Sequence, residues 1–279
     1  MRILFPTDFS DASRAVFPFL SSFADNQGLP IHLLHVYPPP SAATGYEEAG
    51  FDMVSDKVIM ELEKSCQRQM DEFLPALRAI HDPAMGLQGE VRMGTVSDEI
   101  VRASEETPTA FIATAVKESS KLDRLIFGTS VNRTIKRSAV PVLTIPQKSS
   151  VRKISKMAYA TDLGLRDRKV IEHCLKLADS LQAQLDVFHV HDSNLDTERN
   201  ILDEFRLDFS DAIEKGRLNL QLIESLDVEE GMMQYIDENE VDLLVMLRQK
   251  DYWLDLLFNP SHTRKMTLQS HIPVLIYHE

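Results

Sequence analysis

A Gly-Thr-Ser triplet at residues 128–130 stands at the start of a segment that we expect to be helical as far as Ser138. The first backbone N–H groups of a helix have no partner within the helix, and the helix dipole adds partial positive charge there. Glycine lets the backbone approach an anion closely, and the hydroxyls of Thr129 and Ser130 add hydrogen-bond donors. The triplet therefore indicates either a phosphate-binding site or a helix start that Thr129 caps.

Other residue types that could do chemistry form no complete set in the sequence. His189 and His191 face one side of a predicted strand, but no cysteine or paired carboxylate completes a set of metal ligands. His32 and His35 fall on opposite faces of another strand and cannot chelate together. The sequence contains no GxSxG, GxGxxG or GxxxxGK[ST] motif. We therefore expect no catalytic residue and no metal site.

The composition is that of a globular protein and narrows the range of partners. The chain has 279 residues, of which 43% are hydrophobic and 26% charged. It has no apolar run of membrane-spanning length, so we expect no membrane association. The formal net charge of −13 disfavours a long polyanion, so we expect no nucleic-acid partner. The only two cysteines, Cys66 and Cys174, favour a reducing compartment and predict a cytoplasmic protein.

The chain contains two copies of one unit. The segment LFPTDFSDASRAV (4–16) resembles AYATDLGLRDRKV (158–170), and IHLLHVY (31–37) resembles LDVFHVH (185–191), both at a separation of 154 positions. Near the end of each half, AVPVLTIP (139–146) resembles HIPVLIYH (271–278) at a separation of 132 positions. The difference places about 22 extra residues in the middle of the first copy. We expect a first domain over 1–148 and a second over 152–279.

Each copy alternates strands with helices, which is the pattern of a parallel sheet covered on both faces. In the first half we expect strands at Arg2–Pro6, Ile31–Val36, Gln88–Met93, Ala110–Ala115 and Val140–Ile145. We expect helices after Ser10 or Asp11 and at Met53–Ile80, Thr95–Glu105 and Thr129–Ser138. In the second half we expect strands near 156–160, 185–190, 218–223, 242–247 and 273–277. The expected fold is an open, doubly wound sheet in each half.

Ligands of such sheets bind beyond the carboxyl ends of the strands, where the strand order reverses. We expect four parts of the first half to share this mouth: Asp8, Val36, Ala115 and the 116–130 loop.

The segments ILFPTDFSDAS, IHLLHV and PVLTIP, together with the turn from glycine to Thr-Ser, resemble the universal stress protein family in its tandem form. The resemblance implies two repeated doubly wound domains, each with a five-stranded parallel sheet, the adenine nucleotide alpha hydrolase-like fold. It also implies that the last strands, around Pro141–Ile145 and Pro273–Tyr277, pair and make the chain an intramolecular pseudo-dimer. A further homodimer and an unknown protein partner are compatible with this organisation.

Some members of this family bind ATP, and the resemblance implies ATP or AMP, with Mg²⁺, as the ligand of the first half. The positions that it implies for nucleotide binding are Pro6, Thr7, Asp8, Val36, Ala115, Gly128, Thr129 and Ser130. Asp8 would accept a hydrogen bond from a ribose hydroxyl, and Val36 would lie against the adenine. The last three positions would contact phosphate at the start of a helix.

The first half keeps only part of the family's phosphate loop, G-x2-G-x9-G-[ST]. Its residues read A-x2-E-x9-G-T, with Ala115 and Glu118 in place of the first two glycines. A second negative charge about 4 Å from a phosphate costs on the order of 1–4 kcal/mol near a surface. Such a cost weakens binding by roughly tenfold or more.

The second half departs further from the pattern. Its loop glycines are replaced by Leu247, Lys250 and Pro260, with Ser261 following, and the bulky segment DYWLDLLF (251–258) stands where an open loop is expected. We expect this segment to pack over the mouth. Asp162 is retained, and its simplest interpretation is a turn or cap residue. We therefore expect no nucleotide in the second half.

Three hypotheses about function stay open. The first is a stress-response protein, regulatory or protective, whose first domain binds an adenine nucleotide weakly. The second is an interaction scaffold with two degenerate sites. The third, slow ATP hydrolysis, has the least support, because the sequence supplies no evident general base beyond Asp8.

Overall fold

The computed structural model describes residues 1–39, 56–119, 124–126, 129–151, 153–191, 195–248 and 272–278. The chain forms two compact units. Unit 1 comprises Met1–Ala115 and Gly128–Val140, and unit 2 comprises Val116–Phe127 and Pro141–Glu279. Among the helices of the described residues, none is long and apolar enough to cross a membrane.

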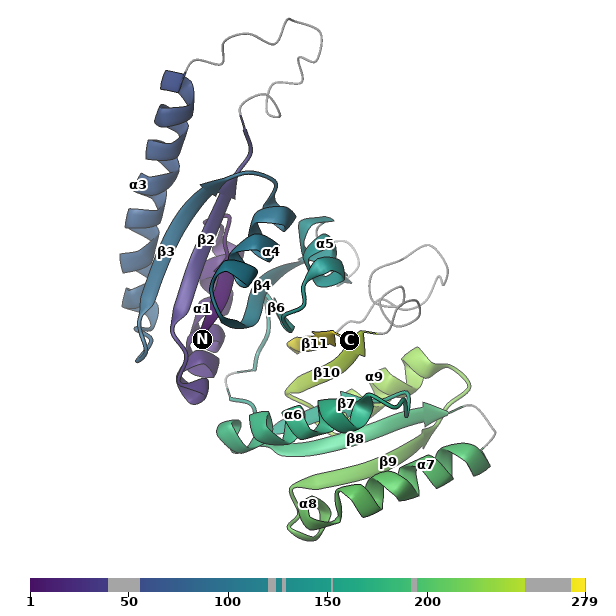
Figure 1. Ribbon diagram of the computed structural model, residues 1–279. Coiled ribbons are helices and arrows are strands. Elements are labelled where there is room, and N and C mark those ends of the chain that lie inside the picture. Colours follow the sequence, from purple (N-terminus) through teal and green to yellow (C-terminus); the bar gives the residue numbers. More distant parts are fainter. Residues whose placement is uncertain are drawn as a thin grey trace, which may run out of the picture. The chain divides into compact units, whose positions relative to one another are not determined.

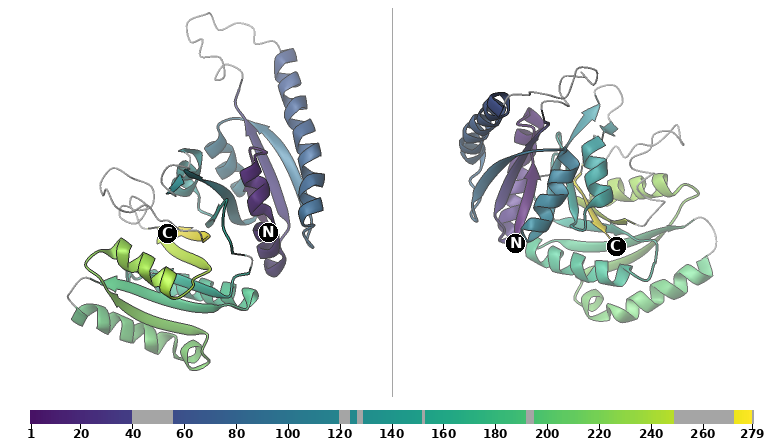
Figure 2. Two further views of the ribbon diagram at one scale, coloured as in Figure 1. Left: turned by 180° about the vertical axis from the view of Figure 1, so that it is seen from behind. Right: turned by 45° about the horizontal axis from the view of Figure 1, so that its top comes forward.

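The elements of unit 1 follow the expected alternation of strands and helices. They are β1 (Arg2–Pro6), α1 (Asp11–Gln27), β2 (Ile31–Tyr37), α3 (Asp56–Ile80), β3 (Leu87–Met93), α4 (Val96–Glu106), the first part of β4 (Thr109–Ser119) and α5 (Thr129–Arg137). Figure 1 and the view from behind in Figure 2 show α1 and α3 on one face of the sheet and α4 on the other. The helices therefore cover both faces, as a buried parallel sheet requires.

The strands of unit 1 are parallel and stand in the order β3-β2-β1-β4. The order reverses at β1, because β2 and β3 lie on one side of it and β4 on the other. The core between sheet and helices contains fully buried aromatic side chains, among them Phe5 on β1, Phe17 on α1 and Phe73 on α3. Their burial fixes which face of each element points into the core. The loops then lie at the carboxyl ends of the strands, where ligands of such sheets bind.

Unit 2 repeats this arrangement. Its elements are β5 (Arg124–Ile126), β6 (Val142–Pro146), β7 (Lys156–Ala160), α6 (Asp167–Leu181), β8 (Gln184–His191), α7 (Leu195–Asp208), α8 (Ser210–Glu214), β9 (Leu218–Glu224), α9 (Val228–Glu238), β10 (Leu243–Arg248) and β11 (Val274–His278). The parallel strands stand in the order β9-β8-β7-β10-β11, so the reversal falls at β7, the counterpart of β1. The structure thus confirms a doubly wound α/β fold in both halves.

The last strands of the two sequence copies pair within unit 2. Strand β6 lies antiparallel to β11, with Leu143 opposite Leu275. The Thr144 hydroxyl also donates a hydrogen bond to the carbonyl oxygen of Val274 at 3.2 Å. This is the pairing that the resemblance implies, and it explains why β6, although it belongs to the first sequence copy, groups in space with unit 2.

Candidate functional site

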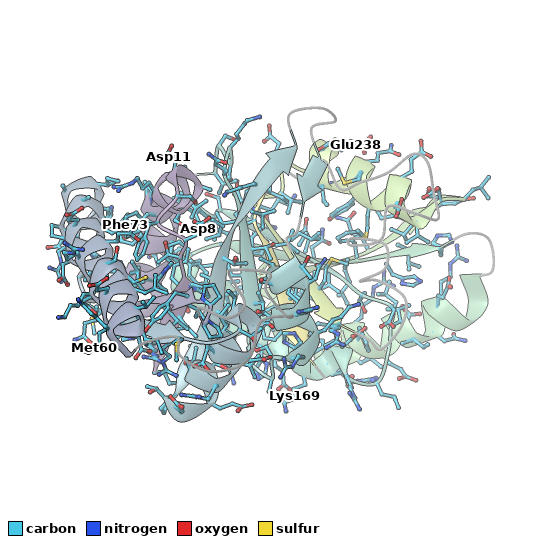
Figure 3. All side chains as sticks on the ribbon, turned by 90° about the horizontal axis from the view of Figure 1, so that it is seen from above. Asp8, Asp11, Met60, Phe73, Lys169 and Glu238 are labelled. Carbon is cyan, nitrogen blue, oxygen red and sulfur yellow. The ribbon has the colours of Figure 1, made fainter. Side chains whose placement is uncertain are left out.

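The chain leaves β1 through a turn that its own side chains hold in place. The Thr7 hydroxyl oxygen accepts a hydrogen bond from the backbone N–H of Phe9 at 3.0 Å. The Oδ1 atom of Asp8 accepts hydrogen bonds from the Ser10 N–H at 3.0 Å and from the Ser13 hydroxyl at 3.4 Å. Asp8 itself is exposed, and Figure 3 labels it together with Asp11, the first residue of α1. The turn therefore fixes a solvent-facing carboxylate at the reversal of strand order.

Phe9 lies in the left-handed region of backbone conformation, at φ 59°, which is rare for a bulky residue. Its ring stacks on His35 with the centroids 4.3 Å apart and meets Phe73 edge-on at 5.4 Å. The His35 Nδ1 atom lies 2.8 Å from the carbonyl oxygen of Thr7. A carbonyl can only accept, so Nδ1 carries the hydrogen and donates it. His35 thus supports the turn both through its ring and through a hydrogen bond.

The other residues of the expected nucleotide site occupy different elements. Pro6 ends β1 and is half-buried, Val36 is buried on β2, Ala115 is half-buried within β4, and Thr129 and Ser130 begin α5. Gly128 lies outside the described residues. Since β1 and β4 are adjacent, with Leu4 opposite Ile112, their carboxyl ends meet at the same edge of the sheet.

The expected 116–130 loop is not all loop, because β4 continues to Ser119 and pairs antiparallel with β5. Glu118 stands opposite Leu125 in this antiparallel pair, and Lys117 stands opposite Ile126. The physical reason lies in the replaced glycines. Glycine weakens a strand, whereas Ala115 and Glu118 allow the strand to run on. Backbone groups of this segment are therefore committed to strand pairing.

The charges on α5 suit an anion at its first turn. Thr129 is exposed and Ser130 half-buried at the helix start, where no acidic residue occurs. The last turn carries Lys136 and Arg137. Positive charge at the carboxyl end complements the helix dipole, and no carboxylate in the first turn opposes an incoming phosphate.

Unit 2 builds the same turn after β7. The Thr161 hydroxyl oxygen accepts the Leu163 N–H at 2.9 Å, and Leu163 has φ 61°. His189 lies with Nδ1 2.7 Å from the carbonyl oxygen of Thr161. The Gly164 N–H donates to Asp162 Oδ1 at 3.2 Å. Each of these residues is 154 positions after its counterpart in unit 1, so the turn is a repeated feature of the chain.

The turn of unit 2 differs from that of unit 1 by a buried carboxylate. Asp167, at the position of Ser13, is completely buried. It accepts hydrogen bonds from the hydroxyls of Tyr159 (2.7 Å) and Thr161 and from the Gly164 N–H (3.0 Å). Burial, followed by the charge of Asp167, raises the pKa of Asp162. The turn of unit 2 therefore carries a buried carboxyl group beside Asp162, where unit 1 has the hydroxyl of Ser13.

The structure describes only part of the second-half loop for which the sequence predicts lost glycines and a covering segment. Leu247 is buried within β10, whereas Lys250, Pro260, Ser261 and the 251–258 segment lie outside the described residues. Within the described ranges, no group of three or more His, Cys, Asp or Glu side chains could hold a metal ion.

The structure adds two residues that the expected site lacks, His35 and Ser13. His35 anchors the carbonyl oxygen of Thr7, and Ser13 orients Asp8. The recurrence of His35 as His189 in the second copy is a signal in the sequence that could have identified the histidine. Ser13 has no such signal, because its counterpart is Asp167.

Comparison with known proteins places the chain in a family. The model of the universal stress protein family matches it twice, over residues 1–146 and 153–278. A search of the curated proteins found no match.

Two solved structures that match nearly the whole chain support the fold. A universal stress protein from Archaeoglobus fulgidus DSM 4304 is 19% identical, with a TM-score of 0.75 over 99% of this chain and 98% of that chain. A Pseudomonas aeruginosa UCBPP-PA14 protein named for the same family is 13% identical, with a TM-score of 0.59 over 99% of this chain and 91% of that chain. Another structure, the Archaeoglobus fulgidus universal stress protein in complex with dAMP, is 19% identical and covers 52% of this chain and 96% of that chain, with a TM-score of 0.34. The double match of the family model shows that the chain belongs to the universal stress protein family and carries two of its domains in tandem.

Proposed function

We propose that this chain is a stress-response protein, regulatory or protective, whose unit 1 binds an adenine nucleotide weakly beyond the carboxyl end of β1. The observation that carries the proposal is the placement of Asp8. Its carboxylate is exposed where the strand order reverses, and Ser10 and Ser13 hold one of its oxygens. An ionised carboxylate only accepts hydrogen bonds, so it suits the hydroxyl groups of a ribose.

The start of α5 supports a phosphate in the same unit. Thr129 and Ser130 offer hydroxyl donors, and the first turn of the helix carries no acidic side chain. A helix N-terminus attracts anions through its free N–H groups and its dipole. Mg²⁺ usually binds nucleotides through phosphate oxygens while keeping several waters, so we expect it to matter for ATP and little for AMP.

Isothermal titration calorimetry of the full chain with ATP and with AMP, each with and without Mg²⁺, tests the proposal. We expect binding in the micromolar-to-millimolar range, and we expect Asp8→Ala to weaken it by roughly tenfold or more, since hydrogen bonds to a charged group contribute about 1.5–3 kcal/mol. Asp162→Ala, at the matching position of unit 2, is the control and should leave the affinity unchanged. No binding of either nucleotide at millimolar concentration, or an equal loss in both variants, contradicts the proposal.

A second candidate function is an interaction scaffold that binds no nucleotide. The β4–β5 hairpin favours it, because the pairing of Glu118 with Leu125 occupies a segment that the family uses as a phosphate loop. The test is Glu118→Gly, which removes a negative charge and weakens the strand. If wild-type protein binds no nucleotide and this variant binds ATP, the scaffold function is supported for the natural chain. Binding by wild-type protein that the variant leaves unchanged counts against it.

A further inference from the structure

Two carboxyl groups in unit 2 converge on one backbone N–H. Gly164 donates to Oδ1 of Asp162 at 3.2 Å and to Oδ2 of Asp167 at 3.0 Å. Asp167 is completely buried, and Asp162 is half-buried. Two carboxylates that accept from the same N–H repel each other, the burial of Asp167 limits the screening by water, and one shared N–H cannot compensate both charges.

Unit 1 has a hydroxyl group in the corresponding place. There the Ser13 hydroxyl donates to Oδ1 of Asp8 at 3.4 Å, and Asp167 is the counterpart of Ser13 in the repeat. A hydroxyl has a hydrogen to donate, whereas an ionised carboxylate has none. A hydrogen bond between Asp162 and Asp167, in the place of the one from Ser13, therefore requires that one of the two carboxyl groups keeps its proton.

Asp167 acts as an acceptor toward its other partners, which places the shared proton on Asp162. The hydroxyls of Tyr159 and Thr161 both donate to Asp167, in addition to the Gly164 N–H. The pKa of Asp162 is raised, first by burial, then by the charge of Asp167 and by a hydrogen bond between the two carboxyl groups.

Other titratable groups are connected to this turn. Tyr159 on β7 donates to Asp167, and Cys174 on α6 interacts electrostatically with Tyr159. His189 on β8 contacts the Thr161 carbonyl oxygen, and Arg168 follows Asp167 on α6. Arg168 is engaged by Asp208 at 2.6 Å and by Glu204 at 2.9 Å on α7. His189 donates to the Thr161 carbonyl, and its other ring nitrogen lies 3.6 Å from Glu198. Burial raises the pKa of Tyr159 and of Cys174, so both stay neutral.

The turn that these side chains hold is strained. Leu163 has φ 61°, a conformation that a leucine adopts at an energetic cost. The hydrogen bonds that hold it run from the Leu163 N–H to Thr161 and from the Gly164 N–H to the two carboxyl groups. Weakening the attachment at Gly164 releases a segment that is already biased to relax.

We propose that Asp162 and Asp167 share one proton, and that this proton holds the turn over residues 161–166 in its closed conformation. We call this proton-dependent contact the latch. It makes the mouth of unit 2 a pH-sensitive switch. When the pair loses the proton, the two carboxylates repel each other and the turn opens. The folded chain holds this proton more tightly than the unfolded chain, because the pKa of Asp162 is raised above its ordinary value of 3.8. The latch therefore contributes stability that is complete below pH 3.8 and is lost as the pH rises through the folded-state pKa.

Amide hydrogen exchange of the full chain, from about pH 4 to about pH 8 and corrected for intrinsic rates, tests the latch. We expect protection of the Leu163 and Gly164 amides to fall as the pH rises through the folded-state pKa of Asp162, because the two carboxylates then repel each other. The matching amides of unit 1, Phe9 and Ser10, are the internal control and should show no such change. Unchanged protection of Gly164 across this range overturns the proposal.

Two variants separate the latch from general loosening of unit 2. In Asp162→Asn, the amide donates to Asp167 without a titrating proton, so protection at Gly164 should stay high at every pH. Asp167→Ser reproduces the arrangement of unit 1 and should also remove the pH dependence. Far-UV circular dichroism checks that each variant is folded. If Asp167→Ser does not fold, Asp162→Asn still decides, and a pH dependence in it equal to that of wild-type protein overturns the proposal.

Discussion

His35 and His189 make the same contact in the two halves of the chain. Each ring donates from Nδ1 to the carbonyl oxygen of the threonine that follows the first strand of its half, at 2.8 and 2.7 Å. In both halves the next residue but one has a positive φ, at Phe9 and at Leu163. A histidine on the second strand thus anchors a strained turn at the reversal of strand order. The hydrogen bond recurs although the two rings have different further neighbours. The His35 ring stacks on Phe9, whereas Nε2 of His189 lies 3.6 Å from Glu198.

His35→Ala should lower the free energy of unfolding by about 2–3 kcal/mol. The change removes one hydrogen bond, leaves the Thr7 carbonyl without its donor and deletes the ring on which Phe9 stacks. Urea unfolding followed by circular dichroism measures the loss. His35→Phe keeps an aromatic ring but not the donor, so it should recover part of the stability. If alanine and phenylalanine at position 35 have the same stability as histidine, the anchoring role is wrong.

Ser13→Asp should weaken nucleotide binding to unit 1 by roughly tenfold or more. The change places a second carboxyl group beside Asp8, as Asp167 stands beside Asp162 in unit 2, and like charges near a surface cost on the order of 1–4 kcal/mol. Calorimetric titration with AMP measures the effect. Ser13→Asn has almost the same size without the charge and is the matched control. An aspartate variant that binds AMP as well as the asparagine variant contradicts the electrostatic explanation.

The stability of unit 1 should decrease as the pH falls below about 6.5 because of His32. Burial and then the positive charge of Arg2 lower the pKa of His32, against the opposing effect of Glu90, whose Oε1 lies 3.2 Å from Nε2. The unfolded chain therefore binds the proton more tightly, and the stability is complete above pH 6.5 and declines toward the folded-state pKa. Urea midpoints measured between about pH 5 and pH 7 should show this slope.

His32→Gln removes the titrating group and should flatten the dependence of the urea midpoint on pH. The neighbouring charges of Arg2, Glu90 and Arg92 remain in the variant, so it isolates the contribution of the histidine. The dependence of stability on pH has the opposite sign for the Asp162 latch, which stabilises unit 2 at low pH. If the urea midpoint of His32→Gln depends on pH as it does in wild-type protein, groups other than His32 cause the loss of stability in acid.

Gly231→Ala should destabilise unit 2 by about 1–3 kcal/mol, the usual cost of overpacking. Gly231 lies on α9, and a Cβ atom there would come within 2.7 Å of Cγ1 of Val190 and of Cβ of Ser225. Alanine would gain about 1 kcal/mol of helix propensity, which is smaller than the expected clash. Urea unfolding measures the net effect. Adding Val190→Ala should restore part of the loss, and a stabilising Gly231→Ala would show that the packing relaxes freely.

The local pattern of apolar and turn residues predicts the position of most strands and helices, as a comparison of their bounds shows. The strands Arg2–Pro6 and Lys156–Ala160 have the bounds expected from the sequence, and the Ile31–Val36 strand is one residue longer than expected. Apolar runs between turn residues are local signals, so their position needs no knowledge of the fold. The 116–130 segment differs most from the expected loop, because 116–119 and 124–126 are strand. Whether β4 stops at Ala115 or continues to Ser119 depends on a pairing partner, β5, that local pattern does not reveal.

The sequence by itself determined the duplication, the alternation of strand and helix, and the presence of Thr7 and Asp8 directly after a strand. Only the tertiary structure decided what those residues contact. His35 reaches the Thr7 carbonyl because β1 and β2 are neighbours, and Asp167 meets Asp162 because a turn with positive φ folds the start of α6 back toward β7. Periodicity reports the environment of a residue along its own segment. The meeting of side chains from different segments depends on strand order and on a few backbone angles, which periodicity does not encode.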